Sequence, residues 1–223
     1  MMRHLALAAG SALLLLTQAL PAAELGMKEK LSYTVGFELG QGLQADEADI
    51  DVDMVLRGVQ DAMTDGARLL DDAQMKEVRA EYQKQRRAAR ERMAQANRER
   101  GQKFLIDNKK KSEVTELPSG LQYQVLKSGN GKSPTLQDRV KVHYRGALLD
   151  GTEFDSSYER GNPTTLPLSR VVPGWREALQ LMKVGGHWKL WVPSGLAYGE
   201  RGAGNRIGPN ETLTFEIELL GIE

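Results

Sequence analysis

The hydrophobic period of this sequence changes once along the chain, near residue 113. Before that point, apolar residues recur every three or four positions, which is typical of amphipathic helices. After it, apolar and polar residues alternate, which is typical of antiparallel strands with one buried face. Helices followed by strands predict an α+β chain rather than an alternating α/β one.

Two short amphipathic helices are predicted within residues 24–70. Their apolar stripes are Leu31, Val35, Leu39 and Leu43 in the first helix, and Val52, Val55, Leu56, Val59 and Met63 in the second. Two short helices bury little core by themselves, so the stripes need a partner, either the rest of the chain or a second copy. We predict a helical dimerisation domain here.

One long helix is predicted over about residues 71–110, inside a connecting segment 71–112. No proline occurs between Pro21 and Pro118, and Asp71 with Gln74 has the spacing of a capping box. A helix of about 40 residues spans roughly 60 Å. Its apolar seam is poor, so we expect a solvated stalk. Gly101 costs the helix about 1 kcal/mol relative to alanine, and we expect the stalk to bend near it.

Charge is strongly segmented. Residues 24–65 carry a net charge of −7, residues 66–112 carry +7, and residues 113–223 carry −1. The basic segment has acidic residues interleaved and no aromatic stacking platform, so no nucleic-acid partner is expected.

Residues 113–223 read as a curved antiparallel sheet wrapped around one short helix. The helix follows Pro173-Gly174, with Trp175, Leu179 and Met182 on one face. The alternating apolar sets are Leu121, Tyr123 and Val125, then Val140, Val142 and Tyr144, then Trp188, Leu190 and Val192, then Leu213, Phe215, Ile217 and Leu219.

The first 23 residues form a predicted signal peptide, with cleavage near Ala22 or Ala23. Its apolar run is short for a membrane anchor. The chain has no cysteine, which excludes disulfides, thiolate chemistry and a lipid anchor on cysteine. We expect a periplasmic protein, and association with the outer membrane or cell surface stays open.

Common catalytic devices are missing from the sequence. No cluster of His, Asp and Glu has metal-binding spacing, so no metal site is expected. No Gly-x-Ser-x-Gly elbow and no phosphate-binding glycine loop occurs, and no cofactor is expected.

An aromatic set with one carboxylate is the chemistry that remains. Asp150-Gly151 predicts a tight turn, which brings Tyr144 close to Phe154 and Asp155. Trp175, Tyr198 and Phe215 complete the set; each alone would be a plain core residue. A dry aromatic pocket with a fixed charge suits proline, whose amide rotates over a barrier of about 18–20 kcal/mol without any nucleophile.

Four segments resemble the FKBP-type peptidyl-prolyl cis/trans isomerases: VHYRGALLDGTEFDSS, VVPGWREALQLMKVGG, VPSGLAYGERGAG and IGPNETLTFEIELL. The resemblance covers residues 113–223 as an isomerase domain. The front end, LSYTVGFELGQGL followed by GVQDAM, is similar to the macrophage infectivity potentiator branch. That branch implies an intertwined homodimer in which the long helix separates two catalytic domains.

The resemblance also implies roles for individual residues. Trp175 would be the floor under the proline ring. The walls would be Tyr144, Phe154 and Phe215, and Ile207 would close the rim. Polar contacts to the substrate would come from the Val172 amide, beside Val171, and from the Tyr198 hydroxyl. Tyr144 and Arg160 would hold Asp155, with its charge facing the twisting amide.

Three rim positions depart from family patterns: Thr164, Ala203 and Arg206. They leave open the sequence preference before proline and the affinity for macrolide inhibitors of the rapamycin type. The expected partners are unfolded or partly folded proline-containing exported proteins. The alternatives are a dimeric periplasmic chaperone with secondary isomerase activity, and a structural dimer with a dead pocket. The intact aromatic set argues against the latter.

Overall fold

The computed structural model describes residues 25–45, 49–64 and 68–223, so the predicted signal peptide lies outside the described residues. The chain divides into two compact units, one ending at Arg68 and the other comprising Leu69–Glu223. Each unit is considered by itself below. None of the described helices has the length and apolar character needed to span a bilayer.

The first unit consists of helices α1 (Met27–Ala45) and α2 (Val52–Met63). Helix α2 begins at Asp51, whose carboxylate accepts hydrogen bonds from the amides of Asp53 and Met54. Both expected apolar stripes line one groove of about 640 Å³ between the helices. Among its described residues the unit buries no apolar side chain, because both stripes face this open groove.

Helix α3 (Asp72–Asn108) opens the second unit and is a single helix, as predicted. The capping box is confirmed: the Asp71 carboxylate accepts from the Gln74 amide at 2.8 Å, and the Gln74 side chain accepts from the Asp71 amide at 2.9 Å. Two orphan donors of the first turn are satisfied in this way.

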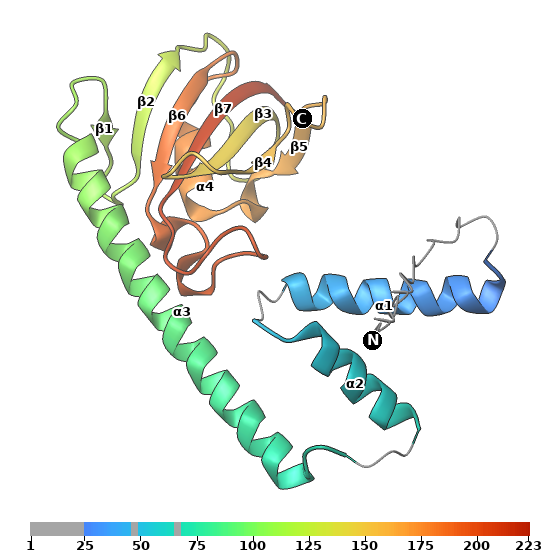
Figure 1. Cartoon of the computed structure of the whole chain (residues 1–223). Coiled ribbons are helices and arrows are strands. Elements are labelled where there is room, and N and C mark those ends of the chain that lie inside the picture. Colours follow the sequence, from blue (N-terminus) through green and yellow to red (C-terminus); the bar gives the residue numbers. More distant parts are fainter. Residues whose placement is uncertain (1–24, 46–48, 65–67) are drawn as a thin grey trace, which may run out of the picture. The chain divides into compact units, whose positions relative to one another are not determined.

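The predicted antiparallel sheet is confirmed (Figure 1). Its described strands lie in the order β1-β2-β6-β7-β3-β4, and β5 pairs with β3. The strands are β1 (Thr115–Glu116), β2 (Gln122–Lys127), β3 (Arg139–Leu148), β4 (Glu153–Ser156), β5 (Thr164–Pro167), β6 (His187–Val192) and β7 (Leu213–Ile222). Short 3-10 turns connect them: η2 (Leu168–Arg170), η3 (Ser194–Leu196) and η4 (Gly199–Arg201).

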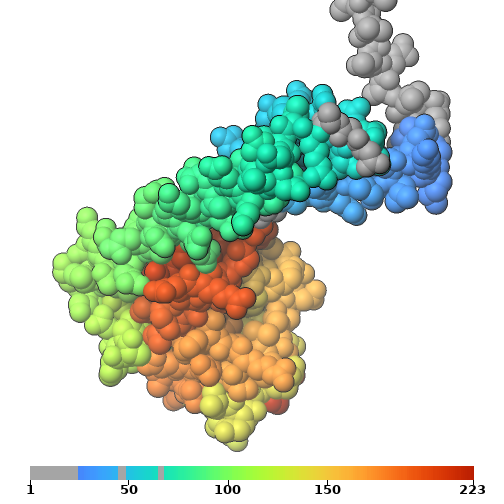
Figure 2. Space-filling view, turned by 90° about the horizontal axis from the view of Figure 1, so that it is seen from below, coloured from blue at the N-terminus to red at the C-terminus, as the bar shows by residue number. Residues whose placement is uncertain are grey.

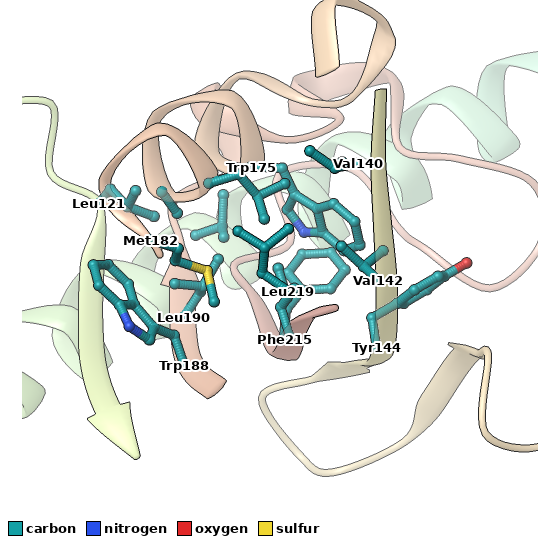
Figure 3. Close-up of a cluster of buried hydrophobic side chains, with 14 of the residues drawn as sticks. Leu121, Val140, Val142, Tyr144, Trp175, Met182, Trp188, Leu190, Phe215 and Leu219 are labelled. Carbon is teal, nitrogen blue, oxygen red and sulfur yellow. The ribbon is translucent and has the colours of Figure 1, made fainter. Parts of the chain in front are cut away.

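The main hydrophobic core lies between the concave face of the sheet and helix α4 (Pro173–Leu181) (Figure 3). Pro173 occupies the first helical position, where its missing N–H costs nothing. The predicted helical face is correct, because Trp175, Leu179 and Met182 are all buried. Val140, Val142, Leu190 and Leu219 meet them from the strands.

The C-terminal half of α3 packs against the sheet domain, so the expectation of a stalk solvated along its whole length is wrong. Figure 2 shows the helix in contact with the segment that precedes β7. Asn97, Gly101 and Asn108 are buried. An ideal Cβ placed on Gly101 would lie 2.3 Å from Oγ1 of Thr212, so the glycine is a contact point and not a solvated bend.

Gln122 shows why the hydrophobic pattern did not predict the packing of α3 on the sheet domain. The alternation of β2 predicts a solvated Gln122, yet its side chain is fully buried. Its Nε2 donates to the Leu105 carbonyl and to the Glu116 carboxylate, each at 2.8 Å, and its Oε1 accepts from Asn108 at 3.0 Å. The seam on α3 combines small or polar residues with one aromatic residue at heptad-like spacing: Ala94, Asn97, Gly101, Phe104 and Asn108.

Replacing Gln122 by alanine should destabilise the second unit by about 1–3 kcal/mol, because the buried Asn108 amide loses its acceptor and the hydrogen bonds to the Leu105 carbonyl and to the exposed Glu116 carboxylate are also lost. Urea unfolding of the full chain, followed by tryptophan fluorescence, measures the change. Gln124→Ala on the same strand is the control and should stay within about 0.5 kcal/mol of wild type. Equal stabilities for the two variants would show that the Gln122 contacts do not hold α3.

Candidate active site

The β3–β4 hairpin brings the first three candidate residues together. Its turn is the predicted one: Gly151 has φ +91°, and the Leu148 amide donates to the Thr152 carbonyl at 2.9 Å. Only glycine adopts that φ without strain. Tyr144 and Asp155 then lie on adjacent paired strands, with Phe154 beside Asp155.

Four aromatic rings form a chain in which each ring meets the next nearly edge to face. Tyr144 lies 5.1 Å from Trp175 at 81°, Trp175 lies 5.3 Å from Phe215 at 84°, and Phe215 lies 5.7 Å from Phe154 at 85°. Figure 3 shows Trp175 and Phe215 side by side, with the Tyr144 hydroxyl directed away from the buried cluster. Edge-to-face pairs add about 0.5–1.5 kcal/mol each beyond their area burial, so the arrangement is rigid.

Gly146 in the middle of β3 makes room for this ring chain, and the sequence reasoning missed it. An ideal Cβ there would lie 2.7 Å from the Phe154 ring and 2.8 Å from the Phe215 ring. A glycine inside a strand pattern often marks such a close approach, so a usable signal was present.

Tyr144, Asp155 and Arg160 form a hydrogen-bonded cluster at the edge of the ring chain. The Tyr144 hydroxyl donates to the Asp155 carboxylate at 2.5 Å, and Arg160 donates to both residues. Partial burial would raise the pKa of Asp155, but the hydrogen bonds from Tyr144 and Arg160 and the Arg160 charge outweigh it and lower that pKa. The cluster therefore holds an ionised carboxylate beside the aromatic rings.

The N-terminus of α4 adds a free backbone donor. Val172 precedes the helix, and its carbonyl accepts the Trp175 amide at 3.0 Å. Its own amide donates to no residue in the described part of the chain. Val171 immediately before it is half-buried against the same core.

The segment between β6 and β7 supplies Tyr198 and Ile207. Burial, followed by the charge of Asp155, raises the pKa of Tyr198, so its hydroxyl stays protonated. Within residues 68–223 the hydroxyl has no hydrogen-bond partner. Ile207 is buried and, with Phe154, lines an open pocket of about 530 Å³.

The three unusual rim positions occupy different places. Arg206 donates to the Phe154 carbonyl at 3.0 Å and lines the pocket with Ala203. Thr164 accepts from Arg160 at 3.4 Å. Across the described residues no group of three or more His, Cys, Asp or Glu side chains could hold a metal ion.

Family comparisons cover almost the whole described chain. Residues 130–220 match the model of the FKBP-type peptidyl-prolyl cis-trans isomerase, and residues 28–125 match that of the domain amino-terminal to it. The chain belongs to the FKBP-type peptidyl-prolyl cis-trans isomerase family. Both parts of the predicted resemblance are therefore confirmed, and the protein is a peptidyl-prolyl isomerase whose substrates are proline-containing proteins.

Relatives of this isomerase are similar over most of their length. The outer membrane protein MIP of Legionella longbeachae is 44% identical over 88% of this chain and 86% of its own. The peptidyl-prolyl cis-trans isomerase Mip of Coxiella burnetii is 42% identical over 88% and 87%. The crystal structure of FkpA from Escherichia coli has a TM-score of 0.65 at 35% identity and covers 89% of this chain and 97% of that one.

Removing the Tyr144 hydroxyl of the isomerase should raise the pKa of Asp155 towards its ordinary value, because a hydrogen bond to the charged form is lost. A carbon-detected NMR titration of the Asp155 carboxyl in Tyr144→Phe and wild type measures the shift. Tyr158→Phe is the control, because Tyr158 donates to Glu218 instead. An unchanged pKa in Tyr144→Phe would mean that Arg160 alone holds the carboxylate.

Proposed function

We propose that the ring chain of Tyr144, Trp175, Phe215 and Phe154 is the seat of the substrate proline, with the ionised Asp155 at its edge. Trp175 is the floor of this seat, the other three rings are its walls, and Ile207 closes it. The observation that carries the proposal is the edge-to-face chain ending beside a carboxylate that two donors hold.

Isomerisation requires only rotation about the C–N bond of the X-Pro amide. The planar amide is stabilised by a charge-separated resonance form that water favours. An aromatic seat that removes water weakens that form and favours the twisted amide. A rate gain of about 10⁴ needs only about 5–6 kcal/mol, which desolvation and oriented dipoles can supply together.

Two unpaired donors are available for the substrate backbone. The Val172 amide and the Tyr198 hydroxyl have no partner in the described part of the chain, so neither must break a bond to bind a carbonyl. In this proposal they fix the peptide on either side of the proline, with Val171 shaping the approach. Donors that are already oriented avoid reorganisation during the reaction.

Asp155 acts through its charge and not through proton transfer. Its lowered pKa keeps Asp155 ionised at neutral pH, and the hydrogen bond from Arg160 restricts the orientation of its carboxylate. The fixed field then acts on the carbonyl dipole of the rotating amide. At the rim, Thr164, Ala203 and Arg206 set the preference for residues next to proline and the affinity for rapamycin-type macrolides.

Asp155→Asn should lower kcat/KM on a short X-Pro peptide by at least about tenfold, because shape is kept while the fixed charge is lost. A protease-coupled isomerisation assay measures the rate, and thermal unfolding reports stability. Phe154→Ala should likewise affect turnover more than stability, because Phe154 is only half-buried at the pocket.

Glu159→Gln is the control for charge loss close to Asp155, because Glu159 is exposed and should keep wild-type activity. If Asp155→Asn keeps full activity, the carboxylate is a structural partner of Tyr144 and has no part in the reaction.

We further propose that the mature protein is exported to the periplasm and acts there as a homodimer through residues 24–70. Helices α1 and α2 carry two apolar stripes, and no element among the described residues of their own unit covers them. A second copy carries the same stripes. In a symmetric dimer each copy therefore fills the groove of the other.

Val35→Glu in the groove should convert the dimer to a monomer, because a buried unpaired carboxylate costs several kcal/mol. Light scattering on the mature chain measures the mass. Thr34→Glu, next to it but outside the groove, should leave a dimer. A dimer that persists in Val35→Glu places the interface elsewhere.

A chaperone role is the second candidate, and the same apolar groove favours it. If free stripes bind unfolded chains, the Val35→Glu monomer should suppress aggregation of a proline-free client only in part, because the new charge also lies on one stripe. If suppression instead needs the cleft of an assembled dimer, it is lost with dimerisation while activity on a short peptide remains.

A further inference from the structure

Helix α3 contacts the segment that carries Tyr198 and Ile207. A helix that served only as a spacer between domains would not need such contacts. We call residues 198–212 the rim loop. It follows η3, ends at the start of β7 and contains the glycines 199, 202, 204 and 208. Figure 2 shows α3 lying against this part of the chain. A glycine-rich loop is costly to order, so its position depends on what holds it.

The N-terminal part of the rim loop, which includes Glu200 and Arg201 and is called its first leg, is held by two arginines of α3. Arg90 donates to the Arg201 carbonyl at 2.6 Å and to the Glu200 carbonyl at 3.3 Å. Arg98 pairs with the Glu200 carboxylate at 3.1 Å. Arg90 therefore occupies the carbonyl end of η4, the turn that begins directly after Tyr198.

The second leg, which includes Pro209 and Glu211, is held by a partly buried polar cluster. Asn97 is buried and donates to the Pro209 carbonyl at 2.9 Å. Arg100 donates to both Asn97 and the buried Glu211, at 3.0 and 3.1 Å. Arg100 is half exposed, but the Asn97 and Glu211 side chains that it joins are buried, so the charge-assisted hydrogen bonds help to fix this part of the loop.

Asn210 ties the two legs to each other and to α3. It has φ +56°, an unusual value outside glycine, and its amide donates to the Gly199 carbonyl at 2.8 Å. Its side chain donates to the Ala94 carbonyl of α3 at 3.4 Å. Between the two legs, Ala203 and Ile207 exchange two backbone hydrogen bonds, at 2.9 and 3.1 Å. A displacement at the base therefore reaches Tyr198 and Ile207.

We propose that α3 is a positioning element of the isomerase site. By fixing both legs of the rim loop, it sets where the Tyr198 hydroxyl and the Ile207 side chain stand relative to the proline seat. This inference rests on the proposed function of those two residues. The helix thus tunes turnover of even a short peptide, for which a spacer between two domains would be irrelevant.

Gly101→Ala tests the proposal in the full mature chain. Alanine favours the helix itself by about 1 kcal/mol, yet its Cβ would collide with Thr212, the last residue of the rim loop. Helicity should stay unchanged or rise, while kcat/KM on an X-Pro tetrapeptide falls about three- to tenfold. Amide chemical shifts of residues 198–212 should move with it.

Two further variants separate docking from folding. Thr212→Ala removes the Oγ1 that the new Cβ meets, so Gly101→Ala/Thr212→Ala should recover most of the activity. Gln102→Ala, one position along the helix and exposed, is the matched control and should behave as wild type. Arg90→Ala removes an exposed side chain, so the domain stays folded while the first leg is freed, and it should lower kcat/KM by about two- to fivefold.

The outcomes distinguish this inference from the proposal on which it rests. Wild-type activity in both Gly101→Ala and Arg90→Ala overturns the positioning role of α3. A Gly101→Ala loss that the Thr212→Ala change does not relieve also overturns it. Tyr198→Phe with unchanged activity instead refutes the role assigned to the hydroxyl. The Gly101→Ala loss should shrink in a Tyr198→Phe background, since the two changes then act on one interaction.

Discussion

The edge-to-face packing of Trp175 between Tyr144 and Phe215 is the contact on which the rest of the catalytic domain depends. One indole joins α4 to β3 on one side and to β7 on the other. Since Tyr144, Trp175 and Phe215 belong to the core and also form the proposed proline seat, core packing and the geometry of that seat are coupled. This explains why Gly146 must lack a side chain, because any Cβ there would push Phe154 and Phe215 apart.

Polar packing extends the domain beyond its hydrophobic core. Helix α3 is attached through Asn97, Asn108 and Gln122, and the compact unit accordingly begins at Leu69. Hydrogen-bonded interfaces give less free energy than apolar ones of equal area, but they fix register, because an unpaired buried amide costs about 1–3 kcal/mol. A helix held in this way can position a loop closely, which is the property the rim loop requires.

The first unit has the opposite character. Both helices have apolar periodicity and Asp51 caps α2, yet their apolar side chains stay largely exposed, and no described residue of the unit occupies the groove between them. Helices of 19 and 12 residues gain little stability from propensity alone, so tertiary or quaternary burial must supply it. The exposed apolar stripes and the isomerase fold are thereby separated along the chain.

The sequence by itself determined the element types, the α3 capping box, the hairpin turn and the aromatic set, because period, caps and glycine turns act locally. It also gave the family, whose motifs recur in order. Only the tertiary structure decided where α3 lies. The seam that docks it consists of Ala94, Asn97, Gly101, Phe104 and Asn108, which apart from Phe104 carry almost no hydrophobic signal. Such a seam is recognisable only when its partners, Gln122, Thr212 and the carbonyls of the rim loop, are brought opposite it, because hydrogen bonds depend on geometry and not on composition.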